Sequence, residues 1–180
     1  MDNNFKWFAL RVRSRCEKVT ATDLANRGYE VCSACAPQRR VWADRIRTVE
    51  MAMFPGYIFA RFDPSNARDV LTSAELISVV GFGNGYCPVE ESEMEALRRV
   101  LQSGVEVQRE PAMHVGKRVR VCYGPLRGLE GVLVQVKNRN RLVISVSLLQ
   151  RSVAVEVDDL IEPVSTSSTS SASTSSQAVA

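Results

Sequence analysis

Two cysteines three positions apart are the first residues in this sequence that could do chemistry. Cys32 and Cys35 have the C-x-x-C spacing used by dithiol redox sites and by one half of a tetrahedral zinc site. No second such pair follows, and the single histidine, His114, is far away along the chain. The pair also falls inside a predicted strand rather than at a helix start. We therefore interpret it as two small buried strand residues and keep a thiol enzyme as an alternative.

Other catalytic patterns are missing from the sequence. His114 has no nucleophile pattern near it, and neither paired carboxylates nor a Ser/His/Asp arrangement is visible. The glycines of Gly81-x-Gly83-x-Gly85 follow a predicted strand, but the rest of a dinucleotide fingerprint is lacking, so turn glycines explain them. The sequence predicts a protein that is not an enzyme and uses no cofactor and no metal.

Basic residues are concentrated near the start of the chain. The net charge is only +3, yet residues 1–47 hold ten Lys and Arg against five Asp and Glu. Arginines on strands and loops can bind phosphate oxygens without reading sequence. A solvated rim is an equally good explanation from charge alone. The candidate nucleic-acid contacts are Arg11, Arg13, Arg15, Lys18, Arg39 and Arg40.

An aromatic strand follows a Pro-Gly turn in residues 54–62. Period-2 geometry sends Tyr57 and Phe59 to one face, where Trp7 joins them from an earlier strand. If helices cover only the other side of the sheet, this face is an exposed apolar patch, which usually marks an interface. Packing under a second domain or under residues 38–53 is the alternative. The candidate partner-binding residues are Trp7, Phe54, Tyr57 and Phe59.

The periodicity of residues 5–104 predicts an α+β domain. Its β-α-β-β-α-β order is typical of a ferredoxin-like split βαβ sheet with helices on one face, to which a last helix is added. A Ser14-x-x-Glu17 capping box is expected to start the first helix. Residues 38–53 are interpreted as a charged hairpin or loop. Strands are expected over 7–12, 29–36, 54–62 and 77–82, and helices over 17–27, 63–73 and 90–103.

The pattern changes after a polar linker over residues 105–112. Alternating valines and leucines over residues 113–164 predict a small closed β-barrel of about five strands. The same alternation favours strands over helices, so we expect a permanent barrel. Residues 165–180 are rich in Ser, Thr and Ala and are expected to be disordered.

The number of cysteines and the distribution of apolar residues indicate the cellular compartment. The five cysteines are an odd number in scattered contexts, which argues against a disulfide framework. No run of 18 apolar residues exists, as a membrane span would require, and the first residues lack the apolar core of a signal peptide. We expect a cytoplasmic, monomeric protein that does not bind membranes.

Two short motifs resemble those of NusG-type transcription elongation factors. Phe54-Pro55-Gly56-Tyr57 is similar to the motif before the central strand of the family's N-terminal domain, and residues 119–131 are similar to its KOW motif. The resemblance covers residues 5–164. It implies a NusG N-terminal-like (NGN) domain over residues 5–104 and an SH3-like KOW barrel over residues 113–164. The KOW-motif residues are Gly124, Pro125, Gly128 and Gly131.

Three further stretches resemble the UpxY-like antiterminators, relatives of RfaH that are often tied to polysaccharide operons. They are residues 39–50, 124–128 and 148–153. Residues 83–87 depart from the Pro/Ala-rich sequence that the family has there. The resemblance therefore implies a specialised, operon-specific antitermination factor.

The resemblance also implies partners. In the family, the hydrophobic face of the N-terminal sheet docks on the β′ clamp helices of RNA polymerase, and the loop near Arg68 and Asp69 corresponds to one that reaches the β gate loop. Arg13 matches a basic position that touches non-template DNA in RfaH-like members. In relatives, the barrel binds ribosomal protein S10, Rho or RNA, and the resemblance leaves open which of them applies here. The positions that match the docking face are Trp7, Phe54, Tyr57 and Phe59.

Such a factor would bias polymerase toward its processive state, which is a population shift that needs no chemistry on a substrate. Pausing and termination would then decrease. The alternative is a ribosome- or RNA-associated KOW-domain protein without polymerase function, which would leave the first domain without a role.

Overall fold

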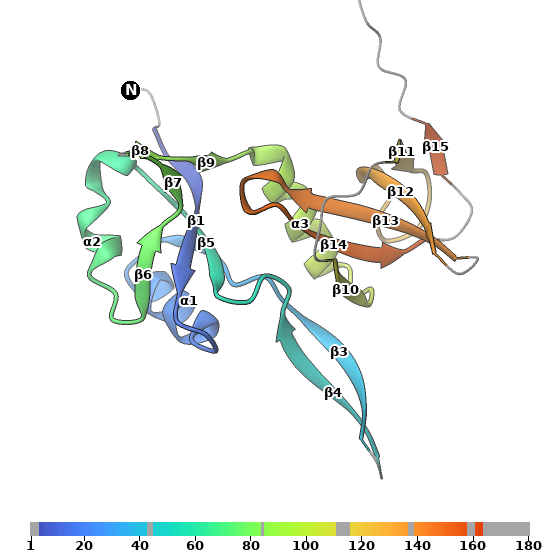
Figure 1. The fold of residues 1–180 in the computed structure, drawn as a ribbon, viewed down its shortest axis with the longest axis horizontal. Coiled ribbons are helices and arrows are strands. Elements are labelled where there is room, and N and C mark those ends of the chain that lie inside the picture. Colours follow the sequence, from blue (N-terminus) through green and yellow to red (C-terminus); the bar gives the residue numbers. More distant parts are fainter. Residues whose placement is uncertain are drawn as a thin grey trace, which may run out of the picture.

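The computed structural model describes residues 4–42, 45–83, 85–110, 116–136, 139–157 and 161–163. Figure 1 shows two sheet-based units beside each other, with helix α3 between them and a two-stranded ribbon that extends away from both. His114 and the predicted tail, residues 165–180, lie outside the described residues. None of the helices within the described ranges is long and apolar enough to cross a membrane.

The first sheet has the split βαβ arrangement. Strand β5 lies between β1 and β2 and is antiparallel to both, so that β1 and β2 are parallel and flank it. Strand β9 also pairs with β1. The strands of this sheet, in spatial order, are β2 (Glu30–Cys32), β5 (Tyr57–Phe62), β1 (Lys6–Val12) and β6 (Leu76–Val79). The short strand β9 (Pro88–Val89) is not part of this order and pairs only with β1 among the described strands.

Helices cover both faces of this sheet, so the expectation of one covered face is wrong. Leu24 of α1 (Glu17–Asn26) and Val70 of α2 (Arg68–Leu71) share one buried cluster with the even-numbered side chains of β1. Helix α3 (Glu91–Gln102) packs its apolar stripe against the opposite face. The period-3.6 pattern showed that α3 has an apolar side, but not which surface it covers.

The start of α1 differs from the predicted capping box. Cys16 is the N-cap residue, and no side chain caps the helix. The carboxylate of Glu17 is buried instead and accepts a hydrogen bond from the backbone N–H of Gly56 at 2.8 Å. Gly56 has φ +79°, which suits glycine. Glu17 therefore holds the turn that precedes β5.

The predicted strand over residues 29–36 is interrupted. Ala34 has φ +47° between β2 and β3, and this turns the chain out of the first sheet. The hairpin predicted for residues 38–53 is confirmed as the ribbon formed by β3 (Cys35–Trp42) and β4 (Arg45–Ala52). A smaller hairpin, β7 (Gly81–Phe82) with β8 (Gly85–Tyr86), accounts for the Gly81-x-Gly83-x-Gly85 spacing.

The second unit is a six-stranded antiparallel sheet rather than a five-stranded one. Residues 107–110, expected in the linker, form β10 and pair with β14. Alternating apolar residues form the predicted strands of its centre, although Val157 lies beyond the end of β14. In spatial order the strands are β10 (Val107–Glu110), β14 (Arg151–Glu156), β13 (Arg139–Val146), β12 (Glu130–Val136), β11 (Lys117–Val121) and β15 (Ile161–Pro163).

Candidate functional site

Three of the four aromatic residues predicted on a partner-binding face are buried. Trp7 is 1% exposed, and Phe54 and Phe59 are 0% exposed. Their rings belong to the cluster that also holds Met94 of α3. The expectation that this face is open is therefore wrong for these three residues, because α3 and the second unit cover it.

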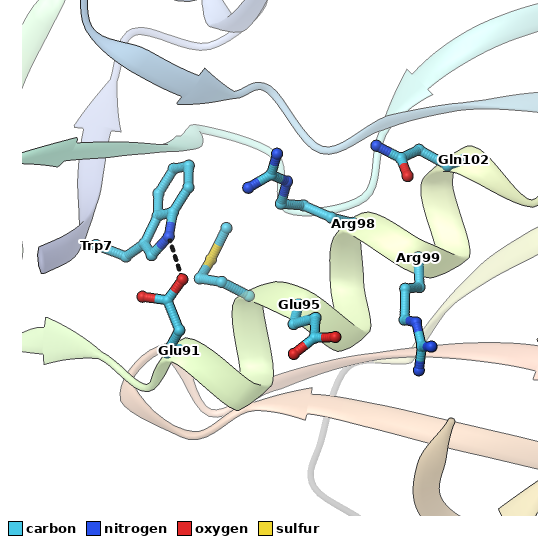
Figure 2. A pocket seen from close by; sticks show the side chains of 7 residues that line it. Trp7, Glu91, Glu95, Arg98, Arg99 and Gln102 are labelled. Carbon is cyan, nitrogen blue, oxygen red and sulfur yellow. Dashed lines mark hydrogen bonds between the residues drawn. The ribbon is translucent and has the colours of Figure 1, made fainter. Parts of the chain in front are cut away.

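Trp7 holds α3 against the sheet, as Figure 2 shows. Its indole N–H donates a hydrogen bond to Glu91 Oε1 at 3.3 Å, and the guanidinium of Arg98 lies 5.6 Å from the ring centroid. Arg98 also donates to Glu30 of β2 at 2.6 Å. The cavity of about 260 Å³ beside Trp7 is lined mainly by these α3 side chains. The geometry is that of a helix anchor.

Tyr57 is the one member of the aromatic set that is half-buried rather than buried. Phe54 and Phe59 pack edge to face beneath it, with centroids 5.7 Å apart. In the register of β1 with β5, Tyr57 is paired with Arg11, so the aromatic residue and a predicted basic contact share one face. Tyr57 is therefore the residue through which this face can reach a partner.

A residue of the second unit covers Tyr57. The guanidinium of Arg151, at the start of β14, lies 5.0 Å from the centroid of the Tyr57 ring. It also donates to the carbonyl oxygen of Pro55 at 3.1 Å. A cation stacked on an aromatic face is attracted by the ring quadrupole, and the hydrogen bond fixes its position. Arg151 thus covers the turn and the ring of the Phe54–Tyr57 motif together.

Two further contacts join the units. Glu93 Oε1 on α3 accepts hydrogen bonds from Ser147, from the backbone N–H at 3.1 Å and from the hydroxyl at 2.6 Å. Gln38 Nε2 of β3 donates to the carbonyl oxygen of Val107 at 3.1 Å. Polar contacts at several points therefore hold the second unit over Tyr57.

The predicted basic residues near the first strand are exposed. Arg11, Arg13, Arg15 and Lys18 all face solvent. Arg13 forms an ion pair with Glu75 at 3.5 Å, and Lys18 forms one with Glu50 of β4. Exposed ion pairs of this kind contribute little to stability, so these cations stay accessible to phosphates. The Lys18–Glu50 pair also brings the first basic group next to the ribbon, where Arg39 and Arg40 occupy β3.

Of the predicted KOW residues, Gly124, Pro125 and Gly128 lie in the connection between β11 and β12, and Gly131 lies in β12. Gly124 and Gly128 have φ +79° and +82°, a conformation that favours glycine. A Cβ on Gly131 would lie 2.7 Å from the carbonyl oxygen of Val143, so this position excludes larger residues. Pro125 lines a cavity of about 320 Å³ beside Tyr123, whose side chain is 65% exposed.

The cysteine pair has no catalytic surroundings. Burial is the main cause that raises the pKa of the Cys32 thiol, which keeps it protonated at neutral pH. The Cys35 thiol donates a hydrogen bond to the carbonyl oxygen of Ser33 at 3.5 Å. No cluster of three or more potential metal ligands occurs among the described residues. These properties suit the structural interpretation of the pair.

The structure joins a mixed α/β unit that has exposed basic residues to a β-sheet unit. The family model described as "Transcription termination factor nusG" matches residues 5–98, just over half of the chain. The protein therefore belongs to the NusG family, whose members are transcription factors rather than enzymes.

Individual relatives agree with this assignment. The chain is 27% identical to the "Transcription termination/antitermination protein NusG" of Synechocystis, with 84% of this chain and 85% of that protein covered. It is 30% identical to the protein of that name from Escherichia coli K12, over 62% of this chain and 65% of that protein. The solved structure described as "Domain interaction in Thermotoga maritima NusG" matches with a TM-score of 0.51 at 18% identity, covering 89% of this chain and 98% of that one, and it supports the fold.

Sequence reasoning missed the residues that join the two units. Arg151, Glu93 and Ser147 are ordinary surface residues by type, and their partners lie 54 or more positions away. No local pattern marks such contacts. The packing of one unit on the other creates them.

Proposed function

We propose that this protein is an operon-specific antitermination factor that docks on RNA polymerase and favours processive elongation. Bound polymerase would spend more time in its closed state, and pausing or termination would decrease accordingly. The proposal assigns the NGN role to the first unit and the KOW role to the second. Its main support is that a NusG-family chain carries Phe54-Pro55-Gly56-Tyr57, in which Tyr57 is half-buried while the other predicted docking aromatics are buried.

Polymerase docking would centre on Tyr57 in this proposal. Phe54 and Phe59 support the ring from below, and Trp7 holds α3 in place, so these buried residues act by shaping the surface. The β′ clamp helices are the proposed partner, with the β gate loop near Arg68 and Asp69. Arg151 and a polymerase helix cannot occupy the Tyr57 ring at the same time. Docking therefore requires the second unit to move.

Nucleic acid is the proposed partner of the basic residues. Arg11, Arg13, Arg15 and Lys18 are exposed, and Arg11 is beside Tyr57 in the register. A strand of non-template DNA or nascent RNA near the docked polymerase would meet them, together with Arg39 and Arg40. Once released from Tyr57, the second unit would be available to ribosomal protein S10 or Rho.

The test is binding of the full chain to core RNA polymerase, with Tyr57→Ala compared with wild type. Truncation of an aromatic residue at the centre of an interface typically costs about 2 kcal/mol or more. We expect about a 30-fold loss of affinity by this reasoning. Tyr123→Ala is the matched control, since it removes the same side chain from an exposed site on the second unit. Equal affinity of folded Tyr57→Ala and wild type would contradict the proposed docking surface.

A ribosome- or RNA-associated KOW protein remains the second candidate. The observation that favours it is the exposed Tyr123 beside the cavity lined by Gly124, Pro125 and Leu126. Binding to ribosomes without binding to polymerase, in the same wild-type preparation, would favour this candidate.

A further inference from the structure

Half of the predicted linker is a strand of the second unit. Residues 107–110 form β10 and pair antiparallel with β14 along their whole length. In the spatial order of the six-stranded sheet, β10 lies at one end, beside β14. Helix α3 ends at Gln102, so the connection between α3 and the second unit consists of residues 103–106 alone. It is four residues long, which is much shorter than the sequence indicated.

Burial holds β10 on β14 in addition to the strand pairing. Val107 of β10 is 0% exposed, and its partner Val155 on β14 is 1% exposed. Paired residues of antiparallel strands point to the same side of the sheet, so Val107 belongs to the buried face that Val155 and Val153 line. Removal of β10 from β14 would return the Val107 side chain to water and leave the β14 edge unpaired. The pairing of β10 with β14 is therefore costly to break.

Two side-chain contacts join β10 to the ribbon of β3 and β4. Gln38 Nε2 donates to the carbonyl oxygen of Val107 at 3.1 Å, and a guanidinium nitrogen of Arg109 lies 3.9 Å from the Met51 sulfur. A thioether sulfur is a weak acceptor, and Arg109 is exposed to water. One hydrogen bond and one weak contact hold less strongly than four strand pairs with a buried valine. The contacts to the ribbon are therefore the ones that break when the two units separate.

The four connecting residues have the features of a hinge. The Ser103 hydroxyl donates to the carbonyl oxygen of Val100 at 2.7 Å and accepts from the backbone N–H of Val105 at 3.3 Å. These bonds end α3 at a defined position. Gly104 follows with φ +69°, a conformation that favours glycine, and a Cβ at this position would meet no heavy atom within 4 Å. The chain can therefore turn at Gly104 without disturbing packed side chains.

We propose that β10 is a strap that stays on the second unit when that unit leaves Tyr57, and that residues 103–106 are the pivot of the movement. Four extended residues span at most about 14 Å, so the second unit swings about the end of α3 instead of moving freely on a long linker. A short tether keeps the effective concentration of the second unit at Tyr57 high. The length of this connection therefore determines how often the Tyr57 ring is uncovered.

The strap gives a mechanism for the movement that the proposed docking requires, and it rests on the proposed function only for the purpose of that movement. The separation of the units is measured in the free protein, without polymerase. A chain that does not bind polymerase can still open about residues 103–106, and a chain that binds polymerase can open elsewhere. Failure of one proposal can therefore be told from failure of the other.

The first measurement is amide hydrogen exchange of the full chain, followed by NMR. The Ser147 amide reports the separation of the units, because Glu93 of α3 accepts its hydrogen bond. We expect the slowest β10 amide to exchange together with the amides of β14, and at least about tenfold more slowly than Ser147. Exchange of every β10 amide as fast as that of Ser147 would overturn the proposal, because β10 would then leave β14 whenever the units separate.

The second measurement places the pivot by inserting six Gly and Ser residues after Gly104. The connection grows from four to ten residues, and the effective concentration falls with roughly the −3/2 power of length, so Ser147 should exchange roughly fourfold faster. The same insertion after residue 111 is the matched control, since it follows β10 and leaves residues 103–106 unchanged. It should leave the exchange of Ser147 as in wild type. Equal acceleration by both insertions would show that β10 is part of a free linker.

Discussion

Burial separates residues of the same chemical type in this protein. Trp7 and Trp42 are the two tryptophans, and one anchors a helix while the other faces solvent. Phe59 and Tyr57 are two positions apart on the same face of β5, yet Phe59 is buried and Tyr57 is only half-buried. The docking proposal therefore rests on Tyr57, because a partner can reach its ring once Arg151 has moved away from it.

Asp23 offers a test of the electrostatics at the scale of one residue. The Ser73 hydroxyl donates to Asp23 Oδ2 at 2.7 Å and lowers the pKa of this carboxyl, with a further contribution from Arg27 at 2.9 Å. A lowered folded-state pKa stabilises the fold above the unfolded pKa, and that contribution is lost as pH falls through the folded pKa.

Ser73→Ala should therefore move the pKa of Asp23 up toward its ordinary value. The measurement is an NMR titration of the Asp23 carboxyl carbon in both proteins. Asp63 provides the control, because Ser65 rather than Ser73 is the main cause that lowers its pKa. An unchanged titration of Asp23 would show that the Ser73 hydrogen bond is not the main cause.

At the scale of elements, α3 connects the two units. Its buried stripe packs on the aromatic face of the first sheet, and Glu93 on another side bonds to Ser147 of the second unit. A helix with both roles must keep its orientation for either contact to form. The anchoring by Trp7 and Arg98 therefore also supports the cover over Tyr57.

Leu97→Ala should destabilise this arrangement. Leu97 is 0% exposed, and truncation of a buried leucine typically costs about 2–5 kcal/mol through lost burial and the cavity that remains. Urea unfolding followed by Trp7 fluorescence measures the effect. Gln102→Ala, at an exposed position of the same helix, should change stability by about 0.5 kcal/mol or less. Similar losses in the two variants would show that α3 is not packed as described.

At the scale of the whole molecule, the second unit and a docked partner compete for one surface. Arg151 lies over the Tyr57 ring and bonds to Pro55, so the described arrangement hides the proposed docking surface. A conformational equilibrium of this kind lowers the apparent affinity of a partner by the fraction of molecules that are open. Residues that hold the second unit over Tyr57 should therefore lower the apparent affinity for polymerase.

Arg151→Ala is expected to bind core RNA polymerase more tightly than wild type. Loss of a cation–π contact worth about 1 kcal/mol would raise the apparent affinity roughly fivefold, if the closed arrangement dominates. Surface plasmon resonance with immobilised polymerase measures this. Arg127→Ala, an exposed arginine in the KOW loop, is the control. Weaker binding by folded Arg151→Ala would mean that Arg151 itself contacts polymerase.

Local patterns in the sequence determined most of the elements. Alternation marked β5 and the central strands of the second sheet, a period of 3.6 marked α3, and the Pro-Gly turn marked the start of β5. The motifs at residues 54–57 and 119–131 also indicated the family that the comparison then established. These signals are local because a strand, helix or turn depends on the dihedral preferences and polarity of neighbouring residues.

Only the tertiary structure decided which surfaces are open. Alternation placed Trp7, Phe59 and Tyr57 on one face, but the packing of α3 and Arg151 decided that two of them are buried and the third is covered. The pairing register likewise placed Trp42 with Arg45 on one side of the ribbon. Such outcomes depend on contacts between residues far apart in the chain, whose free energy appears only when whole elements pack together, so no local pattern encodes them.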